Sequence, residues 1–132
     1  MINAGLLGLG WWGKLIIETL KDSDKIRVTS ASSRTMDKHK KYLEENKINA
    51  FPSYERMLEE NNIDAVIICT PNSQHEDQLA SAIKAKKQVF CEKPMTLSKS
   101  SAENMVRIAD ENDFIIGIGH ERRYDPAIEK LK

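Results

Sequence analysis

The chain has 132 residues, a length typical of one domain, and its 20 lysines and arginines balance 20 aspartates and glutamates. That balance gives no net charge field to attract nucleic acid or an anionic membrane. The apolar stretches fall well below the ~20 residues of a membrane helix. The N-terminus lacks a basic region followed by a cleavage site. We therefore expect a cytoplasmic protein that has neither nucleic acid nor a membrane among its partners.

Strand-like and helix-like runs alternate from one end of the chain to the other. Strands are expected at residues 2–9, 26–31, 49–51, 64–70, 88–91 and 114–119. Helical segments are expected at residues 11–21, 35–46, 54–60, 73–85 and, capped by Ser98 or Ser100, to about 112. Such alternation implies parallel strands joined by right-handed crossovers. The expected fold class is α/β: a Rossmann-type, doubly wound parallel sheet in three layers, with strand order 3-2-1-4-5-6.

Single residues indicate where some of these elements begin and which are buried. The unbroken apolar centre of the strand at 64–70 indicates a strand covered on both faces. Asn72 is the expected N-cap of the helix that follows, and Asp125 with Pro126 is expected to begin a last helix. Apolar residues at helical spacing occur at Leu15, Ile16 and Leu20 in the first helix and at Tyr54, Met57 and Leu58 in the third.

Three glycines, Gly8, Gly10 and Gly13, lie between the first strand and the first helix. In a dinucleotide-binding turn the first glycine permits the tight turn and the second lets the backbone approach the phosphates. The third lets helix and strand pack closely. The free amides and the positive end of the helix dipole then face an anion. The sequence therefore predicts a site for the pyrophosphate of a dinucleotide.

The end of the second strand carries Ser33 and Arg34, about 20 residues beyond the glycine turn. An acidic residue at this position accepts hydrogen bonds from the adenosine ribose in NAD binders. A hydroxyl and a guanidinium suit a 2′-phosphate instead, because arginine offers a planar fork of donors to an oxyanion. We therefore favour NADP over NAD. The alternative is that these two residues merely begin the next surface segment.

Polar residues follow the fourth strand at the same expected edge of the sheet. Thr70, Asn72 and His75 lie in the turn after residue 69, beside the crevice where the strand order reverses. We expect Asn72 and His75 at the cap and third helical positions, so that both point toward a bound cofactor. As a helix cap alone, Asn72 needs no ligand.

The fifth strand ends in Glu92, Lys93 and Pro94, again at the carboxyl edge. A lysine there can hold a substrate hydroxyl and stabilise the charge that changes during hydride transfer. Glu92 is expected either to pair with Lys93 or to hold a cofactor hydroxyl, and Pro94 restricts Lys93 to extended geometry. From spacing alone, a lysine in an ordinary surface loop is the competing interpretation.

Three further residues are candidates for contact with the cofactor. Trp11 and Trp12 are large for the variable positions of a phosphate-binding turn. They are expected either to lean over the cofactor or to donate an indole N–H to it, whereas packing on another domain is the alternative. Arg123 follows the sixth strand and is expected to approach the nicotinamide side, with a role at a domain junction as its alternative.

Cys69 and Cys91 are the only cysteines. Two cysteines are too few for a disulfide scaffold or a structural zinc site, so no metal site is expected. Both end predicted neighbouring strands and are interpreted as small buried thiols in a reducing compartment.

The combined motifs carry a resemblance to a known family. The segments Gly8–Gly13, Cys69–His75, Glu92–Pro94 and Gly119–Pro126 occur in its order and span almost the whole chain. The chain resembles the N-terminal domain of the glucose–fructose oxidoreductase, inositol dehydrogenase and rhizopine catabolism (Gfo/Idh/MocA) family. The resemblance implies that Lys93 contacts both nicotinamide and substrate. It also implies hydride transfer at a carbon bearing oxygen in a sugar, cyclitol or related polyol.

The resemblance also implies a domain arrangement. Residues 1–120 correspond to the NAD(P)-binding domain, and residues 121–132 to the start of a connection to a C-terminal substrate domain that is absent from this chain. In the family that α+β domain supplies most of the substrate pocket and commonly an Asp/His acid–base pair. We therefore expect the isolated chain to be inactive. Relatives usually associate through the sheet of that domain, and the apolar face it covers makes a homo-oligomer a further expectation.

Two other functions are compatible with a dinucleotide turn. One is a regulatory module that binds the cofactor without chemistry, as some relatives of the family do; an intact Lys93 argues against it. The other is a nucleotide-binding domain for a different ligand, such as S-adenosylmethionine, against which the Glu92–Pro94 motif argues.

Overall fold

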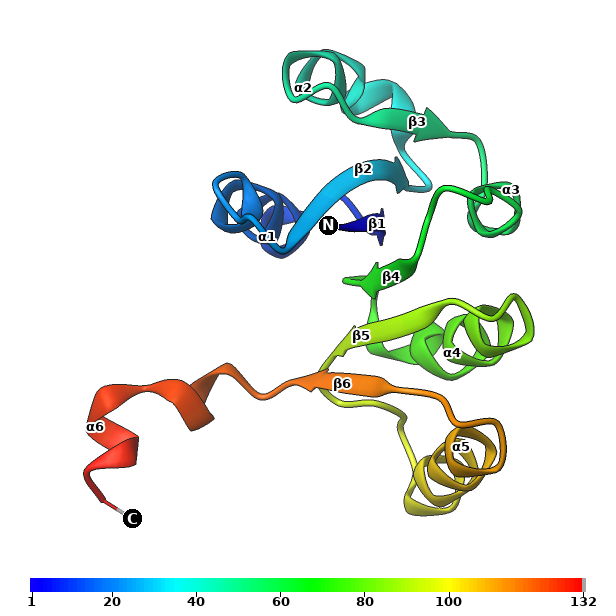
Figure 1. Cartoon of the computed structure of the whole chain (residues 1–132), viewed down its shortest axis with the longest axis vertical. Helices are drawn as coiled ribbons and strands as arrows, with labels where there is room; N and C mark the ends of the chain where they lie inside the picture. The colour runs from blue at the N-terminus through cyan, green and yellow to red at the C-terminus, as the bar shows by residue number, and fades with distance from the viewer. Residues whose placement is uncertain (132) are drawn as a thin grey trace.

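The protein, described here by a computed structural model covering residues 1–131, is built on one six-stranded parallel sheet (Figure 1). The strand order is β3-β2-β1-β4-β5-β6, which confirms the expected doubly wound topology. The strands are β1 (Ile2–Leu7), β2 (Ile26–Ser32), β3 (Asn49–Phe51), β4 (Ala65–Ile68), β5 (Gln88–Glu92) and β6 (Ile116–Gly119).

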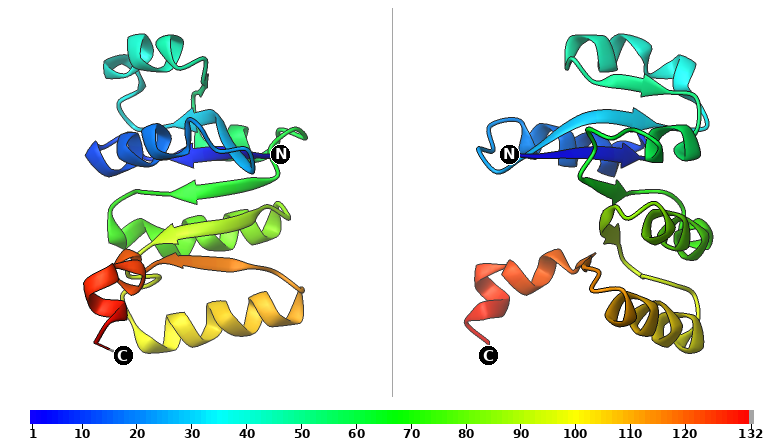
Figure 2. Two further views of the ribbon diagram at one scale, coloured as in Figure 1. Left: turned by 60° about the vertical axis from the view of Figure 1, so that its left-hand side comes forward. Right: turned by 45° about the vertical axis from the view of Figure 1, so that its right-hand side comes forward.

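Helices cover both faces of the sheet. The α-helices are α1 (Trp11–Leu20), α2 (Lys40–Glu45), α3 (Tyr54–Leu58), α4 (His75–Lys84), α5 (Lys99–Glu111) and α6 (Pro126–Glu129). Helices α1 and α2 lie on one face, and α3, α4 and α5 lie on the other (Figure 1). The chain after β6 leaves the sheet through a 3₁₀ turn and ends in the projecting α6 (Figure 2). Within residues 1–131, no helix is long and apolar enough to cross a membrane.

The alternation of side chains in β4 explains why the protein has two cores. Val66 and Ile68 point to the face covered by α3 and α4, where they pack with Leu79 of α4. Ile67 points to the opposite face, where it packs with Ile17 of α1. Because both faces are covered, the strand is apolar without interruption, as expected for a central parallel strand.

Helix α1 packs on the sheet through two buried residues that lie four positions apart on one face of the helix. Gly13 and Ile17 are buried against the sheet, whereas Leu15 remains 40% exposed. The glycine permits close approach and the isoleucine fills the space one turn later. The apolar residue Leu15 therefore marks the outer side of the helix, although its hydropathy alone favours burial.

The boundaries of three segments differ from, or refine, the expected ones. The helical segment at 35–46 is divided into a 3₁₀ turn at Met36–Lys38 and the short α2. Asn72 makes no cap hydrogen bond, because residues 72–74 form a 3₁₀ turn and α4 begins three residues later. The expected N-cap at Asn72 is therefore wrong. Ser98 caps α5 through a bond from the Ser101 amide, and Asp125 caps α6, as predicted.

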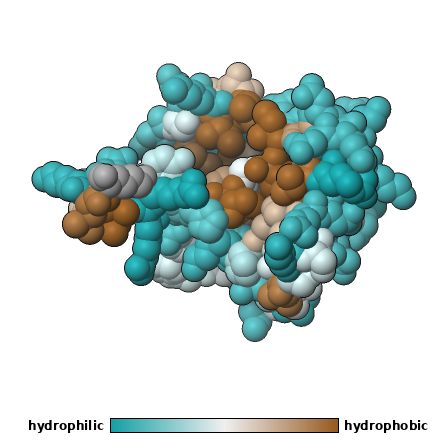
Figure 3. Space-filling model, turned by 90° about the horizontal axis from the view of Figure 1, so that it is seen from below, coloured by the Kyte–Doolittle hydropathy of each residue, from teal (hydrophilic) through white to brown (hydrophobic). Residues whose placement is uncertain are grey.

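One part of the sheet is left without a covering helix. Phe90 alternates along β5 with the core residues Val89 and Cys91, so it points to the opposite face, where it is 39% exposed. The view from below shows apolar residues gathered around a hollow beside the projecting C-terminal segment (Figure 3).

Candidate dinucleotide site

The turn between β1 and α1 requires glycine at two of its three glycine positions for steric reasons. Gly8 has a φ of +98°, and a Cβ there would lie 2.6 Å from the Cys69 carbonyl oxygen. A Cβ on Gly13 would collide with the Gly8 carbonyl oxygen and press on Leu6. Backbone at residues 8, 13 and 69 therefore converges at the junction of β1, α1 and β4.

Gly10 is different, because nothing in the protein lies within 4 Å of the place where its Cβ would be. Its backbone faces open space at the N-terminus of α1. Gly10 is the N-cap but provides no side-chain acceptor, and the first turn of the helix contains no acidic residue. The first amides of α1 and the positive end of its dipole are thus left for an external anion, and the fit to a pyrophosphate is good.

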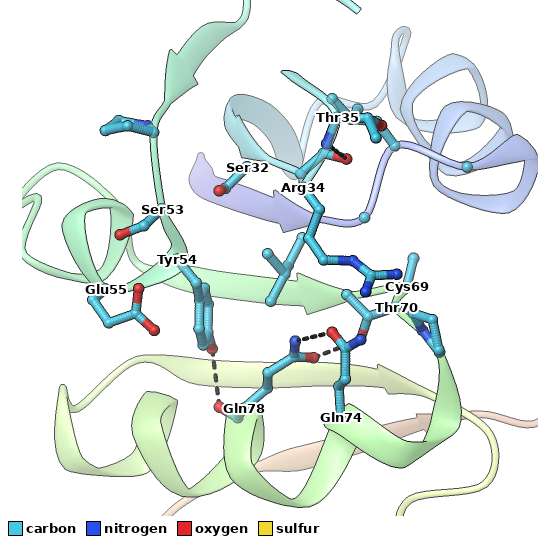
Figure 4. Close-up of a pocket in the computed structure, with 17 residues that line it drawn as sticks. Ser32, Arg34, Thr35, Ser53, Tyr54, Glu55, Cys69, Thr70, Gln74 and Gln78 are labelled. Atoms are coloured by element: carbon cyan, nitrogen blue, oxygen red, sulfur yellow. Dashed lines mark hydrogen bonds between the residues drawn. The ribbon is translucent and has the colours of Figure 1, made fainter. Parts of the chain in front are cut away.

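A cleft of about 580 Å³ opens beside this turn, at the carboxyl ends of β1, β2, β3 and β4 (Figure 4). It occupies the side of the crevice that holds the adenosine half of a dinucleotide in this fold class. Five of the predicted cofactor residues line it: Gly8, Gly10, Ser33, Arg34 and Thr70. The structure therefore brings the glycine turn and the end of β2 into one site.

Arg34 supplies the positive charge of this cleft. Its side chain is exposed and points into the cleft in Figure 4. Within residues 1–131 it forms no ion pair. Glu55 is the one carboxylate among the described residues that line the cleft. The Glu55 amide and the Ser53 hydroxyl lower the pKa of that carboxyl, so it is ionised at neutral pH.

The wall of the cleft opposite Arg34 is a polar network that sequence reasoning missed. Tyr54 donates a 3.1 Å hydrogen bond to the Gln78 carbonyl, and the Thr70 hydroxyl donates to Gln78 Oε1. The Gln78 amide in turn donates to Gln74 at 3.2 Å (Figure 4). One sequence signal could have found Gln74 and Gln78: they are four residues apart, which places them on the same helix face, and they follow the end of a strand, which places that face at the ligand edge.

Lys93 and Arg123 lie together at a second place on the same edge of the sheet. They line a smaller depression of about 270 Å³ with His120, Glu121 and Arg122, and both side chains are exposed. Glu92 does not line it: a Cβ on Gly119 would lie 2.7 Å from its carboxylate, so the carboxylate packs on β6. The Lys93–Pro94 peptide is cis. The structure therefore separates the predicted residues into two groups, one on each side of the crevice.

His75 occupies neither depression. The residue is 0% exposed, and its two ring nitrogens lie 2.7 Å from the Pro94 carbonyl and 2.9 Å from the Thr70 carbonyl. The expectation that this side chain points toward a bound cofactor is therefore wrong. The physical reason is that α4 begins at His75 rather than two residues earlier, which turns the imidazole into the protein.

The two tryptophans lie beside the glycine turn but outside both depressions. Trp11 is 75% exposed, and the centroids of the two indole rings are 5.4 Å apart. The Trp12 indole nitrogen is buried and has no hydrogen-bond partner within residues 1–131. Contact of these rings with a cofactor stays a prediction, as does that of Asn72, which is exposed after β4.

Neither cysteine has the properties of a reactive or metal-binding thiol. Burial, with the charge of Glu92, raises the pKa of both Cys69 and Cys91 to about 12. Among residues 1–131 no group of three or more His, Cys, Asp or Glu side chains is placed to hold a metal ion.

A glycine turn at the first strand, an uncapped helix N-terminus and a cleft where the strand order reverses define a dinucleotide-binding Rossmann domain. Residues 2–120 match the model of the oxidoreductase family with an NAD-binding Rossmann fold (GFO/IDH/MocA). The chain belongs to this family, as the resemblance in the sequence indicated.

The relatives include dehydrogenases of polyols and sugars. Myo-inositol 2-dehydrogenase of Thermotoga maritima is 32% identical over 99% of this chain and 40% of its own length. D-xylose 1-dehydrogenase [NADP(+)] of Haloarcula marismortui is 29% identical over 99% of this chain and 38% of its own length. The scyllo-inositol dehydrogenase of Lactobacillus casei, solved with bound NAD(H) and scyllo-inositol, superimposes with a TM-score of 0.90 at 26% identity. That superposition covers 99% of this chain and 39% of that one. The chain thus spans about two fifths of the relatives it matches.

Proposed function

We propose that this chain is the NADP(H)-binding domain of an oxidoreductase that transfers a hydride between nicotinamide and a sugar, cyclitol or related polyol. The observation that carries the choice of NADP is the presence of Ser33 and Arg34 on the same cleft as the glycine turn. At this position an NAD site holds an acidic residue on the ribose 2′-hydroxyl. Relatives include both an NADP form and a protein solved with NAD(H), so the family alone leaves either coenzyme open.

Charge explains why the end of β2 decides the coenzyme. A 2′-phosphate carries negative charge, which a carboxylate would repel and a guanidinium binds through paired hydrogen bonds. Arg34 has no competing partner within the described chain, so its donors are available to a ligand. Glu55 enters the cleft from α3, a different element from the one that carries Arg34.

The remaining roles follow from position along the crevice. The main chain at Gly8, Gly10 and Gly13 holds the pyrophosphate, and Thr70 with Asn72 lies toward the nicotinamide ribose. Lys93, in the second depression, stands at the reacting centre, as the resemblance implies. Its ammonium group donates a hydrogen bond to the oxygen on the reacting carbon and stabilises negative charge there. When bound, the nicotinamide supplies or accepts the hydride.

A charge-matched pair of variants tests the choice of coenzyme. Arg34→Gln removes the guanidinium from the cleft, whereas Arg27→Gln removes an exposed arginine within β2 that does not line it. Titration of each chain with NADPH and NADH gives four dissociation constants besides the wild-type values. We expect Arg34→Gln to weaken NADPH roughly 10- to 100-fold, the value of charge-assisted hydrogen bonds. NADH binding and both affinities of Arg27→Gln should stay at wild-type values. Equal affinity of the wild type for NADH and NADPH, with no response to Arg34, would overturn the proposal.

A further inference from the structure

His75 is a fully buried titratable side chain at the ligand edge of the sheet, and the proposed chemistry does not use it. We propose that His75 is a positioning residue that fixes the turn carrying Lys93 against the end of β4. The proposal rests on the proposed function, because it gives Lys93 its role at the reacting centre. It concerns the histidine's two main-chain contacts and requires no contact of the imidazole with the coenzyme.

The contacts of the ring show what it connects. One nitrogen lies 2.7 Å from the carbonyl of Pro94, the residue directly after Lys93, and the other 2.9 Å from the carbonyl of Thr70. Carbonyl oxygens only accept hydrogen bonds, so each nitrogen that carries a proton has a partner in place. Either tautomer of the ring therefore donates to one of the two carbonyls and packs against the other.

The segment around Lys93 is attached at several points while its functional side chain stays free. On one side Cys91 is fully buried in the core. On the other, Met95 packs against that core, and Thr96 is buried with its hydroxyl on the Ser98 carbonyl at 2.9 Å. His75 adds a side-chain contact to Pro94, the residue directly after Lys93, whose own side chain is exposed.

The second contact of the His75 ring, with Thr70, lies at the proposed coenzyme cleft. Thr70 lines that cleft, and its hydroxyl belongs to the network with Gln78. The His75 ring thus lies between the loop that borders the first depression and the loop that carries Lys93 in the second, within hydrogen-bond distance of a carbonyl in each. Loss of the imidazole would leave the Pro94 carbonyl without this donor and free the Lys93 turn to shift relative to a bound nicotinamide.

Two ligands separate the halves of the site. Adenosine 2′,5′-bisphosphate contains the adenosine half with its 2′-phosphate, and NADPH adds the nicotinamide half. The ratio of their affinities, which we call the nicotinamide gain, measures what the second half contributes to binding. We expect Lys93→Ala to lower the gain about fivefold, the value of one hydrogen bond. We expect His75→Leu to lower it by the same factor, and the double variant to lower it no further. His75→Gln, whose amide keeps one donor, should fall between His75→Leu and wild type.

Met105→Ala is the matched control for loss of stability. Met105 is buried in α5 and belongs to the core that Met95 contacts, but it makes no bond to either carbonyl. Its removal should lower the melting temperature while the nicotinamide gain stays at the wild-type value. A His75→Leu chain that keeps the wild-type gain, or loses affinity for both ligands equally, would overturn the positioning role. A Lys93→Ala chain with an unchanged gain would remove Lys93 from the site and the proposal with it.

Hydrogen exchange tests the positioning role without any coenzyme, and it also serves if the leucine variant does not fold. In His75→Gln, and more strongly in His75→Leu, we expect faster exchange in the peptides covering residues 70–74 and 93–98. The peptides of α1 should keep the wild-type rate. Uniform acceleration across the chain, or none at residues 93–98, would contradict the positioning role. Failure of the wild type to bind adenosine bisphosphate would instead refute the proposed function, since this exchange pattern does not depend on it.

Discussion

The two depressions at the carboxyl edge of the sheet differ in whether main chain or side chains form them. The first is shaped by main chain, with Gly8 and Gly13 in contact with neighbouring backbone and a half-buried polar wall around Gln78. The second is shaped by exposed charged side chains, among them Lys93 and Arg123. The first depression is therefore fixed largely by backbone geometry, whereas the second depends on exposed side chains.

The sharpest expected contrast between the two depressions is chemical reactivity. Cys69 lines the first depression, and burial, with the charge of Glu92, raises its pKa to about 12. At pH 8 the fraction of Cys69 present as thiolate is then about a thousandfold below that of an ordinary thiol. The thiolate is the form that reacts, so the alkylation rate falls by the same factor. We expect iodoacetamide to modify Cys69 about a thousandfold more slowly in the native chain than in guanidinium. Peptide mass spectrometry measures both rates, with reductive methylation of the exposed Lys93 as the accessible reference. Comparable alkylation rates in the native and the unfolded chain would show that the Cys69 thiol is not protected by burial.

The second largest effect is expected where backbone meets backbone. Gly13→Ala places a Cβ against the Gly8 carbonyl oxygen, which cannot move without shifting β1 or α1. We expect a loss of about 3 kcal/mol in the free energy of unfolding, roughly 100-fold in the folding equilibrium. Gly117→Ala is the control, because its Cβ would meet Phe90 at an ordinary 3.5 Å. Urea denaturation of both variants measures the difference, and equal stability losses would contradict the close packing of helix and strand.

Gly10→Ala separates binding from stability in the same turn. A Cβ at residue 10 meets no protein atom, so the variant should unfold at the wild-type urea concentration or above it. The added methyl lies where we propose that the pyrophosphate approaches the amides of α1. We expect affinity for NADPH and NADH to fall alike, about tenfold. Calorimetric titration beside a urea curve checks both halves of this prediction. Unchanged coenzyme affinity would place the pyrophosphate away from Gly10.

The elements whose signals are local could be predicted from the sequence. The glycine spacing gave the turn, and the alternation of strand and helix gave the strand order, since right-handed crossovers leave few alternatives. The segment at 35–46 was less accessible. There the His39 amide bonds the Met36 carbonyl, which closes a 3₁₀ turn and starts α2 only at Lys40. No residue type at these positions predicts that the helical segment is divided there.

The site residues divide along the same line. Ser33 and Arg34 line the cleft, because the end of a strand fixes their position, and their contact with a coenzyme stays a prediction. His75 does not line it, because its partner Pro94 is 19 residues away and a shift of the helix start rotates its side chain inward. Tyr54 was expected on a buried helix face, and it is buried, but its bond to Gln78 depends on a contact that no local pattern encodes.

The smallest expected effect concerns that bond in the wall of the first depression. Tyr54→Phe removes the 3.1 Å hydrogen bond to the Gln78 carbonyl and should cost about 1 kcal/mol at neutral pH. Burial, with the charges of Cys91 and Glu55, raises the pKa of Tyr54 above its ordinary value near 10. The unfolded chain therefore ionises first, so Tyr54 contributes its full stability below pH 10 and loses it as the pH rises further.

The stability gap between wild type and Tyr54→Phe should accordingly shrink between about pH 9 and pH 11. Tyr42, whose pKa burial and its hydrogen bond to Glu18 raise to about 12, is present in both chains, so its alkaline loss cancels in the subtraction. Urea midpoints at the two pH values measure the gap. If the stability difference between wild type and Tyr54→Phe stayed constant, the Tyr54 hydroxyl would have the same pKa in the folded and the unfolded chain and would be equally accessible in both. The polar wall around Gln78 would then be as open as the depression that Lys93 lines, and the contrast between the two depressions would fail.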